Sequence, residues 1–198
     1  MKKELLLSIL AIVIAAAILF GLSFGLNGIA AANAQEDHLN LLKMMSPGSE
    51  HFTLEPYTGD DANIRSVHKG EKGFVIETVT YGYAGEITMF VGVSNEGKVT
   101  GLVVRDLSET FGLGREALTN VDFLKQFLNQ SGSFAVATPG ADAFSGATET
   151  ADSGEDSIDV DALTGATVTS KAVVRCINSA VAYVTGADAS TAATSWGG

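Results

Sequence analysis

Two stretches of the chain place a threonine hydroxyl directly after a small turn that contains glycine. They are residues 142–148 (DAFSGAT) and residues 161–167 (DALTGAT). Only the second is followed at once by a long helical pattern, over residues 168–184. The first N–H groups of a helix have no partner within the helix and carry the positive end of its dipole, which favours a phosphate. The second stretch therefore predicts a phosphate site beside a threonine.

The residues of the second stretch also suit an ordinary helix start. Gly165 allows the backbone to approach a neighbour closely, and Ala166 leaves the surroundings sterically open. Thr169, two residues after Thr167, is expected to cap the helix, because threonine is a common capping residue. Residue types alone leave both interpretations open.

The first stretch has nearly the same sequence pattern but lies in a different part of the chain. It lies in residues 139–159, which contain no Lys or Arg and are predicted to form an acidic loop or insertion. Glu149 and Asp152 would repel a phosphate there, and no helical pattern follows to receive one. We therefore expect the phosphate at Thr167 and not at Thr148.

Other kinds of chemistry find little support. A single cysteine, Cys176, excludes an internal disulfide and a cysteine-based metal centre, and its place in a helix predicts burial. The three histidines, His38, His51 and His68, lack metal-ligand spacing, and no Ser/His/Asp arrangement suggests hydrolysis. The net charge of −11 disfavours nucleic acid. The sequence predicts no metal, no catalytic residue and no nucleic-acid partner.

The N-terminus predicts a membrane anchor. Residues 5–35 carry no charged side chain, and residues 5–27 are apolar and long enough to form one transmembrane helix. Lys2 and Lys3 predict a cytoplasmic N-terminus, which places the main domain on the extracytoplasmic side of the cell (inner) membrane. A cleaved signal peptide, with a small-residue site at 32–34, is the alternative, but the apolar run exceeds the usual signal core.

Strands precede the candidate site. β-branched and aromatic residues predict strands over 73–81, 86–93 and 98–105, with a hairpin turn at 94–97. A helix starting at Thr119 or Asn120 is expected to end near Gly132, before a short strand over 134–138; its apolar face comprises Phe123, Leu124, Phe127 and Leu128.

The last helix is expected to be amphipathic. Its apolar stripe comprises Val173, Ile177, Ala180, Val181 and Val184, and its polar side comprises Lys171, Arg175 and Asn178. Strands mixed with helices predict an α+β fold. The predicted organisation is a cytoplasmic N-terminus (1–4), a transmembrane helix (5–27), an extracytoplasmic helix and connector (28–65), one domain (66–186) and a flexible tail (187–198).

Residues 161–173 resemble the flavin-attachment motif of the FMN-binding domain family. Residues 82–93, followed by residues 98–102, look like the family's central hairpin, and residues 108–114 look like its Glu-Thr-Pro-Gly loop. Phe111 stands where the family usually has proline, which loosens the backbone expected for that loop. The resemblance covers about residues 73–186 as well as the N-terminal span.

The resemblance implies a covalent cofactor. Thr167 would carry FMN through a phosphoester bond made by a separate flavin transferase, which in that family reads the residue matching Asp161. The other residues implied to contact the cofactor are Thr164, Gly165, Ala166, Val168, Thr169, Glu109, Thr110 and Gly112.

The resemblance also implies a function. It suggests an electron-carrier subunit, not catalytic alone, of a membrane-bound, ion-translocating ferredoxin:NAD+ oxidoreductase of the Rnf type, assembled with other membrane and peripheral subunits. Alternatives are a component like the C subunit of a Na+-translocating NADH:quinone oxidoreductase, or a stand-alone extracytoplasmic flavoprotein carrier. A cofactor-free, membrane-tethered structural or adhesion domain is the rival from another class.

Overall fold

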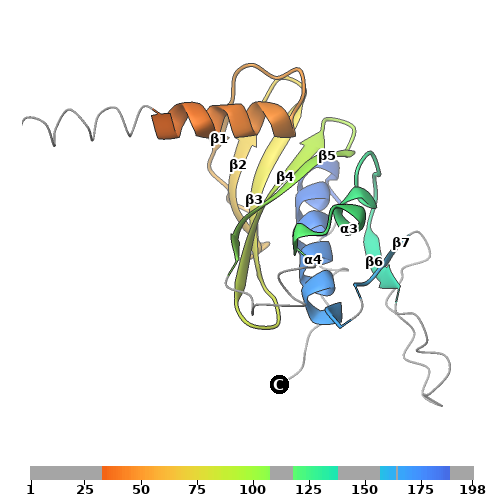
Figure 1. The fold of residues 1–198 in the computed structure, drawn as a ribbon. Coiled ribbons are helices and arrows are strands. Elements are labelled where there is room, and N and C mark those ends of the chain that lie inside the picture. Colours follow the sequence, from red (N-terminus) through yellow and green to blue (C-terminus); the bar gives the residue numbers. More distant parts are fainter. Residues whose placement is uncertain (1–32, 108–117, 138–156, 164, 188–198) are drawn as a thin grey trace, which may run out of the picture. The chain divides into compact units, whose positions relative to one another are not determined.

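The computed structural model describes residues 33–107, 118–137, 157–163 and 165–187 (Figure 1). The predicted membrane span and the predicted loop at 108–114 lie outside these residues. None of the helices in the described ranges is long and apolar enough to cross a membrane.

A five-stranded antiparallel sheet forms the main layer. Its strands lie side by side in chain order: β1 (Thr53–Glu55), β2 (Ile64–Lys69), β3 (Gly73–Tyr81), β4 (Glu86–Ser94) and β5 (Val99–Leu107). The sequence predicted the three longest of these strands and the turn between β4 and β5. In that turn Gly97 has a φ of 81°, and the Ser94 N–H donates to the Lys98 carbonyl at 2.8 Å. The left-handed backbone at this position favours glycine.

Several short strands lie in segments that the sequence predicted as irregular. Residues 51–65, the second part of the segment expected to form a helix and connector (28–65), contain β1 and the start of β2. The end of the predicted acidic loop belongs to β7 (Ile158–Asp161), which pairs in parallel with β6 (Phe134–Ala137). Strands of 3 or 4 residues carry too little periodicity to stand out, so pairing with neighbours decides their structure.

Helix α3 (Val121–Lys125) begins where predicted and ends earlier. The Asn120 side-chain oxygen caps it by accepting the N–H groups of Asp122 and Phe123, at 2.9 and 3.1 Å. Regular helix was expected to continue to near Gly132, but it stops after one turn, and Asn129 adopts a left-handed φ of 62°. The expected apolar side chains nevertheless join the core.

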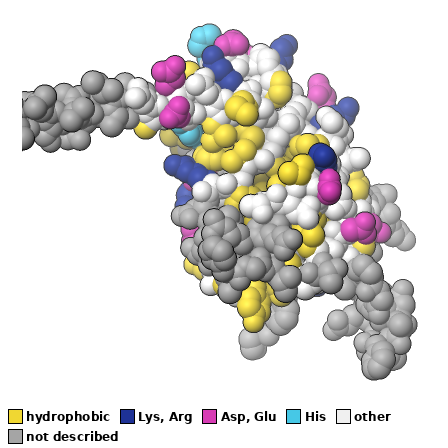
Figure 2. Space-filling model, viewed as in Figure 1, with side chains coloured by type: hydrophobic (Ala, Val, Ile, Leu, Met, Phe, Trp, Pro, Cys, Tyr) yellow, Lys and Arg dark blue, Asp and Glu magenta, His cyan; other side chains and the backbone are white. Residues whose placement is uncertain are grey.

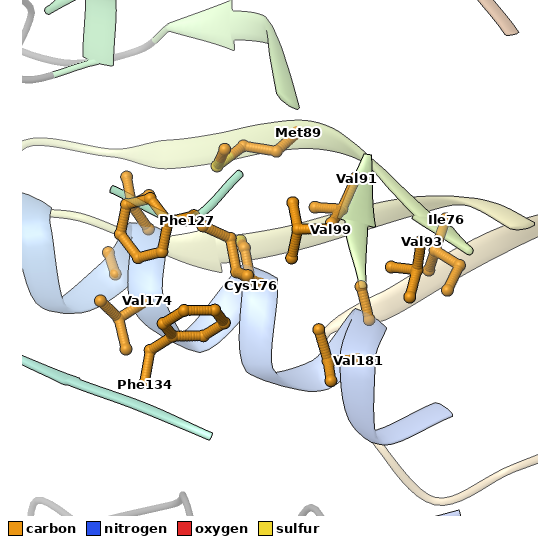
Figure 3. Close-up of a cluster of buried hydrophobic side chains, with 14 of the residues drawn as sticks. Ile76, Met89, Val91, Val93, Val99, Phe127, Phe134, Val174, Cys176 and Val181 are labelled. Atoms are coloured by element: carbon orange, nitrogen blue, oxygen red, sulfur yellow. The ribbon is translucent and has the colours of Figure 1, made fainter. Parts of the chain in front are cut away.

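Helix α4 (Thr167–Thr185) is the central element of the core. It packs against β3 and β4 on one side and against β6 on another (Figure 1). Figure 3 shows its buried side chains, among them Val174, Cys176 and Val181, facing side chains of the sheet and the ring of Phe134. Gly186 ends the helix with a φ of 70°, and its N–H donates to the Ala182 carbonyl at 2.9 Å. These elements confirm the predicted α+β fold.

The opposite face of the sheet holds Met45 at the end of a helix formed by residues 33–45. Gly92 and Gly101 pair across β4 and β5 and leave room for the Met45 backbone and side chain. The Thr100 hydroxyl donates to the Met45 carbonyl at 2.6 Å. We call Gly92, Gly101 and Thr100 the glycine notch.

Charges on the described surface are mixed in sign. On the face shown in Figure 2, basic side chains lie among acidic ones. Three such pairs are Arg65–Glu86, Lys69–Glu55 and Lys43–Glu50, and all six side chains are at least partly exposed. Pairs of this kind each contribute at most about 1 kcal/mol, because water and salt screen them.

Candidate functional site

The start of α4 has no side-chain cap. Its capping position is Ala166, whose methyl group accepts no hydrogen bond, and no acidic residue lies in the first turn. Gly165, just before it, has a left-handed φ of 77°. The Ser170 N–H reaches the Ala166 carbonyl at 2.8 Å, so the helical bonding starts only there. The N–H groups of the preceding turn are therefore suited to an external acceptor.

Thr167 is the first residue of this helix and is half-buried. The neighbouring Val168 is 46% exposed, so the first turn opens to solvent. Ala166 and Gly165 lie beside it as expected, whereas Thr164, Glu109, Thr110 and Gly112 lie outside the described residues. The structure thus brings Gly165, Ala166, Thr167 and Val168 together at the helix start.

The predicted cap at Thr169 is wrong. The helix begins two residues earlier, and Thr169 is only 1% exposed within its first turn. Packing against the core, which residue type does not reveal, directs this side chain inward. Next to it, the Ser170 hydroxyl accepts the Leu163 N–H at 3.3 Å, and the Ala166 N–H donates to the Leu163 carbonyl at 2.9 Å. The connection into α4 is therefore held by its own bonds.

The solvent-facing strip of α4 is basic. Thr167, Lys171 and Arg175 recur every four residues, whereas most of the helix between them is buried. Side chains on a helix lean toward its N-terminus, so Lys171 leans toward the turn that contains Thr167. No ion pair of either cation occurs among the described residues. This arrangement adds positive potential to the uncapped helix start.

Two amide side chains that sequence reasoning missed as site residues hold the β6–β7 pair. Asn178, predicted on the polar side of α4, is buried; it accepts the Phe134 N–H and donates to the Phe134 carbonyl, both at 2.9 Å. Gln126, at the end of α3, bonds the backbone of Asp161 in the same way. Its side chain accepts the Asp161 N–H at 2.8 Å and donates to the Asp161 carbonyl at 3.4 Å. The only sequence signal for Asn178 was one amide in an apolar run.

Cys176 is a core residue, as predicted. It is fully buried, and desolvation raises the pKa of its thiol to about 11, partly offset by a hydrogen bond to Thr78. Its thiolate is therefore scarce at neutral pH, and it has no place in the site chemistry.

The fold and the site define an α+β domain that presents a threonine hydroxyl at an uncapped helix N-terminus. The sequence model of the FMN-binding domain matches residues 82–182. The chain belongs to the FMN-binding domain family.

Known relatives agree with this placement. The chain is 34% identical over 161 residues to the G subunit of the ion-translocating oxidoreductase complex of Methanosarcina acetivorans, covering 75% of this chain and 76% of that protein. It is 33% identical to the G subunit of the Na(+)-translocating ferredoxin:NAD(+) oxidoreductase complex of Acetobacterium woodii, over 55% of this chain and 47% of the relative. It is 32% identical to the G subunit of the proton-translocating ferredoxin:NAD(+) oxidoreductase complex of Clostridium ljungdahlii, over 61% of this chain and 58% of that relative. The chain thus spans about half the length of the latter two relatives.

The residues present at the site fit the phosphate of FMN. The uncapped first turn can supply N–H donors, Gly165 is exposed and has no side chain, and no acidic side chain of the first turn opposes a negative charge. Thr167 offers the hydroxyl through which a phosphoester could form.

Proposed function

We propose that this chain is the electron-transfer subunit, carrying covalent FMN on Thr167, of a membrane-bound, ion-translocating ferredoxin:NAD+ oxidoreductase. The observation that carries the proposal is the uncapped start of α4 at Thr167, inside the segment that matches the FMN-binding domain. All three relatives are named as the G subunit of an ion- or proton-translocating oxidoreductase complex, which supports the choice of complex.

The chain's own residues hold and orient the cofactor. The first-turn N–H groups and the positive end of the α4 dipole bind the phosphate, and Lys171 adds a positive charge on the same strip. FMN, when bound, supplies the one- and two-electron redox chemistry that no side chain of the chain offers. A covalent bond replaces binding affinity with a permanent local concentration, so the ring can stay accessible to the next carrier.

The wider assembly is part of the proposal. A membrane anchor over residues 5–27 would hold the domain on the extracytoplasmic side, beside other membrane and peripheral subunits of the complex. A separate flavin transferase would attach the FMN and read Asp161.

The test is flavin fluorescence in a denaturing gel, after expression with an active flavin transferase. We expect the wild-type band to fluoresce, Thr167→Ala to lose the signal, and the matched variant Thr148→Ala to keep it. Peptide mass mapping would place the FMN on the peptide that contains Thr167. A fluorescent Thr167→Ala band would overturn the assignment, and a dark wild-type band would overturn the flavoprotein itself.

A stand-alone flavoprotein carrier is the remaining alternative of the same chemistry. Purification from native membranes separates the two: the proposed subunit co-purifies with polytopic membrane proteins in fixed ratio. Isolation as a lone flavoprotein from gently solubilised membranes would favour the alternative.

A further inference from the structure

Asp161 sits on an open edge of the β6–β7 pair. On one side β7 pairs with β6, where Asp161 lies opposite Ala137. On the other side no strand follows in the described residues, and the amide of Gln126 takes the place of one by bonding both the N–H and the carbonyl of Asp161. A primary amide can replace a strand because it offers one donor and one acceptor in the same plane.

The opposite edge of the pair is closed in the same manner. Asn178 bonds both backbone groups of Phe134 on β6. Asn178 belongs to α4, which begins at Thr167. A continuous set of hydrogen bonds therefore ties Asp161, through β7 and β6, to the helix that starts at Thr167.

Leu163 and Ala166, which lie between Asp161 and Thr167, are also held by hydrogen bonds. The Leu163 N–H bonds the Ser170 hydroxyl, and the Ala166 N–H bonds the Leu163 carbonyl. Asp161 itself stays exposed. Its backbone is thus fixed while its side chain faces solvent, as suits a residue that a second protein must read.

We propose that Gln126 is a positioning residue for flavin attachment, because it fixes the Asp161 backbone relative to Thr167 before the flavin transferase docks. This inference rests on the proposed function. Ordering a loose residue during docking costs conformational entropy, which weakens the encounter. When Gln126 holds Asp161, the chain already meets this cost when it folds, and binding of the transferase does not have to meet it again.

The attachment step itself is a phosphoryl transfer. The Thr167 hydroxyl oxygen forms a bond to the FMN phosphorus, and its proton passes to a base. The donor must hold that phosphorus in an anhydride bond, as FAD does. The anhydride bond breaks and AMP leaves. No oxidation or reduction is involved, and Gln126 touches none of the reacting atoms.

The experiment measures the rate of flavin attachment to the purified, unmodified full chain with flavin transferase and FAD. Gln126→Ala removes the amide, and Gln126→Met removes it while keeping the side-chain length. The matched control is Gln130→Ala, since Gln130 is exposed and makes no side-chain hydrogen bond to described residues. We expect both Gln126 variants to lower kcat/KM for attachment about three- to tenfold, with full labelling at long times, and the control to match wild type.

Two further readouts separate positioning from mere stability. Amide hydrogen exchange at Asp161 should speed up in both Gln126 variants, and the thermal midpoint should stay near that of Gln130→Ala. Faster exchange at Asp161 with unchanged kcat/KM would overturn the inference, and so would unchanged exchange. A wild-type chain that accepts no flavin would instead overturn the proposed function.

Discussion

The role proposed for Thr167 depends on three neighbours more than on its own residue type. Gly165 is left-handed, Ala166 offers no cap, and Lys171 follows one turn later on the solvent side. The sequence predicted the hydroxyl, the glycine and the helix, because each is encoded locally. It did not predict the missing cap, since Thr169 has the right type for a cap and only its burial removes it. Whether a polar side chain points inward depends on residues far away in the chain.

Glu71 shows a different residue-scale effect, in the turn between β2 and β3. Its carboxylate accepts the Glu50 N–H at 3.0 Å and lies 3.0 Å from Nδ1 of His51. Hydrogen bonds from its own backbone N–H and then from His51 lower the pKa of Glu71 from 4.5 to about 2. Glu71 thereby joins residues 50–51 to the sheet.

This link predicts a specific pH dependence. Because the pKa is lower in the folded chain, the carboxylate stabilises the link above pH 4.5 and loses that effect as pH falls toward about 2. The protection factors of the Glu50 and His51 amides, which compare their exchange rates with the intrinsic rates at each pH, should therefore fall over this window, as NMR can measure. Glu71→Gln should show protection factors at these two amides that are lower than in the wild type near neutral pH and do not change over this window. A Glu71 carboxyl that titrates at its ordinary value would contradict the prediction.

The elements differ in how far local sequence determines them. β3, β4 and β5 have 9 residues each. Their apolar side chains either alternate with polar ones or occupy most positions, so the hydrophobic pattern of the sequence predicted these strands. β1 and β7 are short and partly polar, and they exist because a neighbouring strand offers partners. The hydrogen bonds of the Gln126 and Asn178 amides depend in turn on the β6–β7 pair, because the backbone groups that they bond belong to these strands. The side chains that support the candidate site were therefore harder to predict than the helix that begins at Thr167.

The glycine notch gives an element-scale prediction. A Cβ at Gly92 would collide with the Met45 backbone, whereas a Cβ at Gly101 would meet the Met45 sulfur at 3.0 Å. A flexible methionine side chain moves more cheaply than a hydrogen-bonded backbone. Gly92→Ala should lower the free energy of unfolding by about 1–3 kcal/mol, and Gly101→Ala by clearly less. Denaturant titration of both variants checks this, and equal losses would refute the backbone argument.

At the scale of the whole molecule, α4 connects the sheet to the β6–β7 pair. It is buried on both sides, and in its first half it meets solvent mainly along the strip that contains Thr167 and Lys171 and at the neighbouring Val168. The amphipathic pattern of the helix predicted one buried side. The second buried side is the one that packs against β6, and the helix pattern did not predict it. The same burial leaves Cys176, the chain's single cysteine, fully inaccessible and its thiol with a pKa raised to about 11.

That unreactive cysteine permits a direct test of the predicted membrane orientation. Ala62 lies exposed in the turn before β2, and a cysteine there changes little volume. In intact spheroplasts, a membrane-impermeant maleimide should label Ala62→Cys, and it should leave wild type unlabelled because the Cys176 thiolate is buried and scarce. The matched variant Lys3→Cys should react only after the membrane is permeabilised, because the two N-terminal lysines favour the cytoplasmic side. If Lys3→Cys reacts first and Ala62→Cys is protected, the domain faces the cytoplasm and the predicted orientation is reversed.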